Sequence, residues 1–130
     1  MENEFTYIGD FSITTNNQYE LQAEELEDSI VINVTGRIDG ISAQEFHDKV
    51  NQEIQDLDHH IVMDFKKLSY INSAGLRSIL FIAKELRKKS KMFILCSLPD
   101  PVMQVIKTSG FDKIIDICET RSAAMAKIAG

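Results

Sequence analysis

The feature that most constrains the fold of this chain is a short apolar run followed closely by a long stretch with helical spacing. Residues 61–65, IVMDF, form a run of the kind found in strands that are buried on both faces. Apolar residues then recur at the spacing of one helical face: Leu76, Ile79, Leu80, Ala83 and Leu86. Residues 84–89 add cations at the end of this stretch, where they favour the negative pole of a helix dipole. The sequence therefore predicts a buried strand that leads into an amphipathic helix.

The same alternation of strand-like and helix-like segments covers most of the chain. Ser42 and Glu45 have the spacing of a capping box, and Thr120 is placed to cap the last helix. Because strands and helices alternate after an opening β-hairpin, we predict an α/β sandwich with a mixed, mostly parallel sheet of about five strands and about four helices. Strands are expected at 19–24, 30–34, 61–65, 92–96 and 114–118, and helices at 42–57, 72–89, 100–109 and 120–130.

The chain has the size of one globular domain. It contains 130 residues, of which 44% are hydrophobic, and this leaves little room for a second core. Residues 1–17 have no clear period and include the polar run TTNN, so we expect a loose or lightly docked N-terminal extension. The domain proper is expected to span residues 18–130, without an internal repeat or linker.

Charge and hydropathy exclude several classes of function. The 14 basic residues against 20 acidic residues give a net charge of −6, which repels nucleic-acid phosphates and anionic membrane surfaces. No apolar run approaches the ~20 residues that cross a bilayer. The N-terminal residues have neither the basic start nor the apolar stretch of a secretory signal. We therefore expect a cytoplasmic protein that has no membrane span and does not bind nucleic acid.

Residues that commonly hold metals or cofactors are sparse in this chain. Cys96 and Cys118 lie in separate apolar runs, where buried thiols behave as small hydrophobic side chains. The three histidines lack metal-ligand spacing to each other or to either cysteine. Neither a GxGxxG motif nor a P-loop occurs. We expect no metal ion and no cofactor.

Catalytic motifs are equally weak. Residues 71–75, INSAG, contain a serine followed by x-Gly, as in the second half of a nucleophile elbow. Ile71 replaces the first glycine of that motif, and every histidine lies upstream of Ser73, whereas the α/β-hydrolase order requires one downstream. The sequence therefore predicts that the chain is not an enzyme.

The stretch from Val62 to Leu80, VMDFKKLSYINSAGLRSIL, resembles the signature of the STAS domain, the fold of bacterial anti-sigma factor antagonists. In that signature, a buried strand ending in Asp is followed by x-x-Leu-x-x-Ile-[Asp/Ser/Asn]-Ser-x-Gly-Leu. The run from Val34 to Asp39 also resembles the turn after the second strand of the family, so the resemblance implies a STAS-type sandwich. Six residues of the signature match in register: Asp64, Leu68, Ile71, Ser73, Gly75 and Leu76.

The resemblance implies a protein-interaction switch controlled by phosphorylation. In the family, one serine at the start of the second helix is phosphorylated by a serine/threonine protein kinase and restored by a serine phosphatase. The unmodified form binds the kinase, which in many systems is itself the anti-sigma factor. The switch serine maps to Ser73, and Ala74 makes it the only hydroxyl between Asn72 and Leu76. Asn72 replaces an Asp that is frequent in the family, which removes a negative charge beside the switch.

We expect the residues around Ser73 to form the partner-binding surface. Each of the main candidates also has an ordinary structural alternative. Ser73 would serve as a simple helix N-cap, Asp39 as a turn former, and Arg77 as a solvated helical side chain. The expected partner-binding residues are Arg37, Asp39, Asn72, Ser73, Ala74, Gly75, Leu76 and Arg77.

Two other classes of function remain open at the level of sequence. One is a stand-alone STAS subunit of a membrane transport system, which would dock on a transporter or ATPase without needing phosphorylation. The other is a ligand-binding domain, which would require a pocket.

Overall fold

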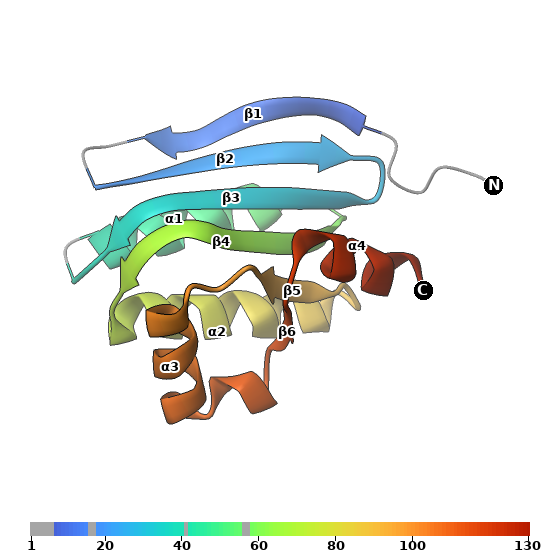
Figure 1. The fold of residues 1–130 in the computed structure, drawn as a ribbon. Helices are drawn as coiled ribbons and strands as arrows, with labels where there is room; N and C mark the ends of the chain where they lie inside the picture. Colours follow the sequence, from blue (N-terminus) through green and yellow to red (C-terminus); the bar gives the residue numbers. More distant parts are fainter. Residues whose placement is uncertain (1–6, 16–17, 41, 56–57) are drawn as a thin grey trace.

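The computed structural model describes residues 7–15, 18–40, 42–55 and 58–130. Within these ranges, six strands form one sheet, and their order across the sheet follows their order in the sequence (Figure 1). The sheet is mixed, because its first three strands pair antiparallel and the later strands continue parallel to the third. The strands are β1 (Tyr7–Thr15), β2 (Tyr19–Leu26), β3 (Ser29–Ile38), β4 (His60–Ile71), β5 (Phe93–Cys96) and β6 (Asp116–Cys118).

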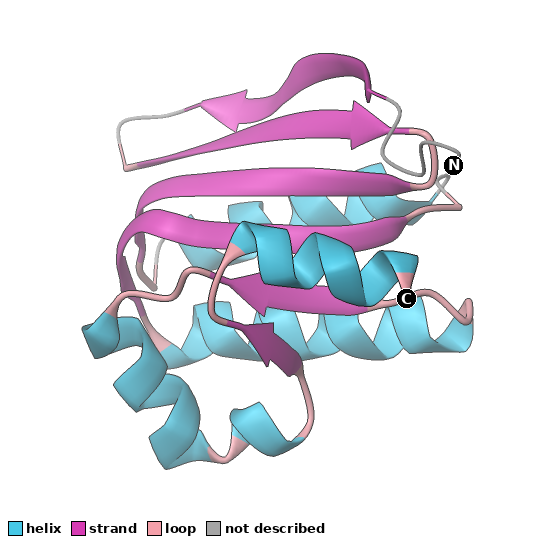
Figure 2. Cartoon of the chain, turned by 45° about the vertical axis from the view of Figure 1, so that its right-hand side comes forward, coloured by secondary structure: helices cyan, strands magenta, loops and turns pink. Residues whose placement is uncertain are grey.

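Four helices occur in the described ranges, and all of them follow parallel strands. Right-handed crossovers between successive strands place the three connecting helices on one face of the sheet. The last helix has no strand after it and packs against the opposite face (Figure 2). The helices are α1 (Ser42–Gln55), α2 (Ser73–Lys88), α3 (Asp100–Ser109), which a short 3-10 turn (Phe111–Lys113) follows, and α4 (Arg121–Ala129). This α/β sandwich is the kind of fold that the sequence predicted.

Each face of the sheet has its own hydrophobic core. The larger core joins the sheet to the three connecting helices, and it includes Phe46, Ile79 and Val102. The smaller core lies under α4 and includes Val62 and Ala124. The start of β4 contributes side chains to both cores, which confirms the prediction of a strand buried on both faces.

The two cysteines differ in their surroundings. Cys96 is completely buried, and this burial raises the pKa of its thiol to about 11. Cys118, on the neighbouring strand, is only half-buried. The prediction of a buried and inert thiol is therefore confirmed for Cys96, whereas Cys118 is more accessible than predicted.

Residues 7–15 belong to the segment that was expected to be a loose or lightly docked extension, but the structure describes them as a strand of the sheet. They form β1, pair with β2, and pack Phe11 and Ile13 against the larger core. The pairing shifts register between Tyr7 and Gly9, and it shifts again farther along the strand. These irregularities interrupt the alternation that would have indicated a strand. The rest of the predicted extension lies outside the described residues.

The start of α1 also differs from the prediction. The hydroxyl oxygen of Ser42 accepts a hydrogen bond from the backbone N–H of Asp39 (2.9 Å), and the Asp39 carboxylate accepts one from the N–H of Ser42 (3.1 Å). This reciprocal pair is a capping box that begins at Asp39 rather than at Ser42. Glu45, the predicted partner of Ser42, instead accepts a hydrogen bond from the hydroxyl of Tyr19 (2.9 Å).

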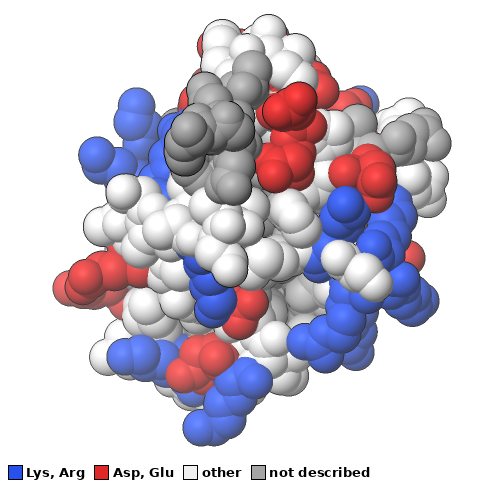
Figure 3. Space-filling view, turned by 90° about the vertical axis from the view of Figure 1, so that its right-hand side faces the viewer, with Lys and Arg blue, Asp and Glu red and all other residues white. Residues whose placement is uncertain are grey.

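Charged side chains are unevenly spread over the surface. On the face shown in Figure 3, the largest group of basic side chains lies on the right, smaller basic groups lie at the upper left and along the lower edge, and acidic side chains form separate groups. The last turn of α2 carries Arg87 and Lys88, as the sequence predicted for that helix end. None of the helices in the described ranges combines the length and the hydropathy needed to cross a membrane.

An ion pair with two hydrogen bonds fastens α4 to β2. Arg121 donates from Nη1 to one oxygen of Glu24 (2.9 Å) and from Nη2 to the other. Asn33 on β3 adds a third hydrogen bond to the same carboxylate (2.8 Å). The hydrogen bond from Arg121 is the main cause that lowers the pKa of Glu24 below its ordinary value.

We predict that Glu24→Gln lowers the free energy of unfolding by about 1 kcal/mol near neutral pH. Because the pKa of Glu24 is lowered in the folded state, its stabilising effect is complete above the pKa of the unfolded chain. The effect is lost as the pH falls through the folded pKa. Urea denaturation across acidic and neutral pH checks this, with Glu119→Gln as a control on an exposed carboxylate. A difference from wild type that does not change with pH would contradict the prediction.

Candidate functional site

The pairing of β3 with β4 brings two distant loops to one edge of the sheet. The strands run parallel, and Ile38 lies opposite Ile71 where they end. The N–H of Asn72 extends this pairing, because it donates a hydrogen bond to the carbonyl of Ile38 (3.0 Å). The loop after β3 and the turn into α2 therefore begin side by side, as the sequence predicted for the segments around Asp39 and Ser73.

The residue that caps α2 is Asn72. Its backbone is extended (φ −95°, ψ −179°), and its side-chain oxygen accepts a hydrogen bond from the N–H of Gly75 (2.9 Å). Ser73 is the first residue of the helix, and it is exposed. The alternative in which Ser73 serves as the helix cap is therefore wrong, and the residue is accessible from solvent.

Gly36 sets the direction in which β3 ends. Its φ of +103° lies in the region that favours glycine, and a Cβ there would be 2.1 Å from the carbonyl oxygen of Gln18. That oxygen accepts a hydrogen bond from the N–H of Arg37 (2.8 Å). The pairing with β4 shifts register at this point, and Arg37 is exposed. Its guanidinium lies 4.5 Å from the centre of the Tyr70 ring, within the range of a cation–π contact.

A shallow hollow of about 280 Å³ lies between α1 and α2, next to the first turn of α2. Ala74 and Arg77 line one side of it, directly after Ser73 in the helix. The surface beside Ser73 is therefore concave. The lining residues are Gly40, Ala43, Gln44, His47, Ala74, Arg77 and Ser78.

The structure divides the predicted partner-binding residues into two groups. Gly75 and Leu76 are buried, and a Cβ on Gly75 would lie 2.7 Å from Cγ1 of Ile71. These two residues pack α2 against the sheet, so their expected place on the partner-binding surface is corrected. The exposed or half-buried group consists of Arg37, Asp39, Asn72, Ser73, Ala74 and Arg77.

The sequence analysis missed residues that border the same surface. Tyr70 is 41% exposed and lies beside Arg37. Buried and exposed residues do not alternate strictly in this part of β4, so the sequence pattern did not predict that Tyr70 faces outward. Gln44 and His47 border the hollow from α1. Helical spacing indicates that these two residues share a face, but nothing in the sequence indicates that this face meets α2.

Comparison with known proteins decides the family. Residues 20–124 match the STAS domain. The chain belongs to the STAS domain family. The match confirms the family that the signature from Asp64 to Leu76 indicated.

Several proteins that are similar to this chain are named as anti-sigma factor antagonists. BtrV of Bordetella bronchiseptica, named as an anti-sigma factor antagonist, is 29% identical over 106 residues, which cover 82% of this chain and 91% of BtrV. The anti-sigma factor antagonist SpoIIAA in its unphosphorylated form has a TM-score of 0.72 and 23% identity, covering 85% of this chain and 96% of SpoIIAA. The phosphorylated form of Bacillus SpoIIAA has a TM-score of 0.64 and 22% identity, and the match covers 83% of this chain and 98% of the SpoIIAA chain. The two SpoIIAA structures share the fold of this chain.

The STAS signature spans the end of β4 and the first turn of α2. Asp64 is 8% exposed, and its Oδ1 accepts a hydrogen bond from the N–H of Lys66 (2.9 Å). The apolar members of the signature and Gly75 are buried as well. Ser73 is thus the one signature residue at the surface, whereas the other five hold the strand and the helix together.

We predict that Asn72→Ala lowers the free energy of unfolding by about 1 kcal/mol, because the N–H of Gly75 loses its side-chain acceptor. Ser73→Ala is expected to change the same quantity by less than about 0.5 kcal/mol, because Ser73 does not cap the helix. Urea denaturation of both variants checks the comparison. A larger loss for Ser73→Ala than for Asn72→Ala would contradict the assignment of the cap.

We predict that Gly75→Ala is destabilising by about 1–3 kcal/mol, because the added methyl group overlaps Ile71 and Ile38. Gly40→Ala is the matched control, since its nearest neighbour would be the Asn72 amide at an ordinary contact distance of 3.5 Å. Thermal unfolding followed by circular dichroism measures both variants. Equal melting temperatures would show that the first turn of α2 is less tightly packed than described.

Proposed function

We propose that this STAS domain is a cytoplasmic protein-interaction switch whose control residue is Ser73. The unmodified form binds a serine/threonine protein kinase or anti-sigma factor, phosphorylation of Ser73 releases it, and a serine phosphatase restores binding. The observation that carries the proposal is the exposure of Ser73 within a signature whose other residues are packed. The names of BtrV and SpoIIAA, and the phosphorylated form of SpoIIAA, support the same role.

The start of α2 can accept a phosphate without a change of fold. The first amides of a helix have no acceptor within the helix, and they lie at the positive end of its dipole. Asn72 occupies only the amide of Gly75, and the first turn contains no acidic residue. Arg77 lies one turn farther along the same helix and is exposed. These features favour an anion at Ser73.

Phosphorylation would instead change what the surface can bind. A phosphate adds about −1.5 to −2 charges at neutral pH, and the chain already carries −6. A partner surface that fits a neutral hydroxyl offers no cation to compensate for burial of this charge. Such burial costs several kcal/mol, and because about 1.4 kcal/mol changes an affinity tenfold, binding falls steeply.

We predict that phosphorylation of Ser73 weakens binding of the cognate kinase by about a hundredfold or more. The kinase is first captured from native lysate on the unmodified protein and identified by mass spectrometry. Titration calorimetry then compares the unmodified and phosphorylated forms, and NMR shifts report the fold. Affinities within about threefold of each other would refute the exclusion mechanism, and shifts spread through the whole sheet would refute a change confined to the surface.

A matched pair of serines controls for the position of the modification. Ser122 is also exposed and also lies in the first turn of a helix, α4, whose N-cap is the side chain of Thr120. The kinase is expected to phosphorylate the wild type and Ser122→Ala but not Ser73→Ala. Stoichiometric phosphate on Ser73→Ala would move the switch to another residue. Recovery of a membrane transporter with Ser73 unmodified would favour the alternative of a transport subunit.

A further inference from the structure

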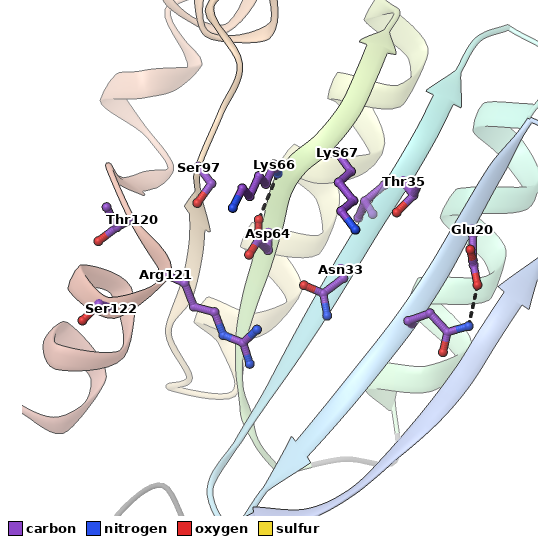
Figure 4. A pocket seen from close by; sticks show the side chains of 12 residues that line it. Glu20, Asn33, Thr35, Asp64, Lys66, Lys67, Ser97, Thr120, Arg121 and Ser122 are labelled. Atoms are coloured by element: carbon purple, nitrogen blue, oxygen red, sulfur yellow. Dashed lines mark hydrogen bonds between the residues drawn. The ribbon is translucent and has the colours of Figure 1, made fainter.

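We propose that the sheet face opposite α1 and α2 binds a small hydroxylated organic anion, of the class of sugar phosphates and sugar acids. The site is a cavity of about 790 Å³, bordered by β2, β3, β4, the residue after β5 and the first turn of α4 (Figure 4). It shares no lining residue with the hollow beside Ser73. The proposal is therefore independent of the phosphorylation switch.

The cavity exists because α4 covers only part of this face. Helix α4 packs over Val31, Val62 and Ile94, which lie in the first halves of β3, β4 and β5. Farther along β3 and β4, the same face carries polar side chains and no helix, so the first turn of α4 forms one wall of a cavity. The volume lies within the range of small-molecule sites, about 300–1,000 Å³.

A bulge in β4 aims two lysines at the cavity. Asn33 pairs with Asp64, but the next registered pair is Thr35 with Lys67, so β4 has one extra residue at this point. A regular strand would send Lys66 and Lys67 to opposite faces. In this strand both lysines are exposed and line the cavity. Figure 4 shows both side chains projecting from β4 toward the interior of the cavity.

These lysines provide positive charge that is not already neutralised. Neither Lys66 nor Lys67 forms an ion pair with a residue in the described ranges, whereas the nearby Arg121 is bound to Glu24. Arg121 and Ser122 begin α4, so the positive end of its dipole borders the same space. Two carboxylates, Glu20 and Asp64, also line the cavity, and Glu20 accepts a hydrogen bond from Gln22, so an anionic group is favoured beside the two unpaired lysines rather than throughout the cavity.

Asp64 narrows the class of anion to one that also carries hydroxyl groups. Its side chain lines the cavity although the residue is only 8% exposed. Its Oδ1 accepts the N–H of Lys66, and its other oxygen accepts no hydrogen bond from the described residues. This second oxygen is not buried and is accessible from the cavity, and a carboxylate oxygen accepts hydrogen bonds from hydroxyl groups. A hydroxyl of the ligand donates this hydrogen bond, while the anionic group of the ligand contacts the lysines.

The hydroxyl groups around the cavity suit a polar ligand of this kind. Thr35, Ser97, Thr120 and Ser122 line it from three segments: β3, the residue after β5, and the start of α4. Ser97 has a φ of +59°, which is uncommon for a residue other than glycine. Strained residues of this type cluster at ligand sites.

The proposal is tested by NMR titration of the ¹⁵N-labelled protein with glucose 6-phosphate, gluconate, inorganic phosphate and glucose. Glucose 6-phosphate is expected to shift the amides of residues 66–67, 97 and 120–122, with a Kd at least about tenfold below that of inorganic phosphate. Gluconate separates the sugar acids from the sugar phosphates, and glucose is expected to cause no shift. The proposal is overturned if neither organic anion shifts these amides at about 10 mM, or if inorganic phosphate binds equally well.

Matched variants locate the site. The double substitution Lys66→Gln with Lys67→Gln is expected to raise the Kd for glucose 6-phosphate by about tenfold or more. The control, Lys107→Gln with Lys113→Gln, removes the same charge from the segment around α3 and is expected to leave the Kd unchanged. Equal weakening by both pairs would reduce the effect to general electrostatics and overturn the assignment.

Asp64→Asn tests the role of the hydroxyl groups. The amide retains an oxygen for the N–H of Lys66, but it removes the carboxylate from the cavity. This variant is expected to bind glucose 6-phosphate more weakly. Its affinity for inorganic phosphate is expected to stay the same or to rise, because a nearby negative charge is lost. An identical change for the two ligands would contradict the proposed contact. If the variant does not fold, as judged by circular dichroism, the lysine pair and the ligand series decide the question.

Discussion

The parallel pairing of β3 with β4 is the interaction on which the rest of this structure depends. It places the ends of two strands at one edge, and the hydrogen bond from Asn72 to Ile38 carries the pairing into the turn that begins α2. The exposed position of Ser73 follows from that turn, as does the neighbouring position of Arg37. A shift of one register position would separate these residues and also reverse which side chains of β4 are buried.

The STAS signature in this chain combines two physical tasks that a sequence motif does not distinguish. Leu68, Ile71 and Leu76 belong to the core, and Gly75 is required because its neighbours leave no space for a methyl group. Ser73 contributes little to that packing. Under the proposed function, this separation would let phosphorylation of Ser73 change binding while the packed residues of the signature stay in place.

Sequence reasoning succeeded where burial on one or both faces leaves a strict period, as in residues 61–65 and in α2. It failed for β1, because register shifts in its pairing with β2 break the alternation. At the site, spacing placed Ser73 at the helix start, but serine and asparagine are both good caps, so only geometry assigned the role to Asn72. The hollow beside Ser73 and the cavity under α4 depend on how helices pack against the sheet, which the sequence does not show. Lys67 faces the cavity because of a bulge in β4, and no local sequence pattern indicates that bulge.

The two outermost strands have a consequence for how this domain meets other chains. β1 is irregular in register, and β6 has only three residues. Open strand edges that are long and flat recruit further strands and lead to aggregation, and both irregularity and shortness prevent this. Both features disfavour the addition of a further strand at the margins of the sheet. Association is directed to helices, loops and the open face, where recognition depends on side-chain chemistry rather than on backbone ladders.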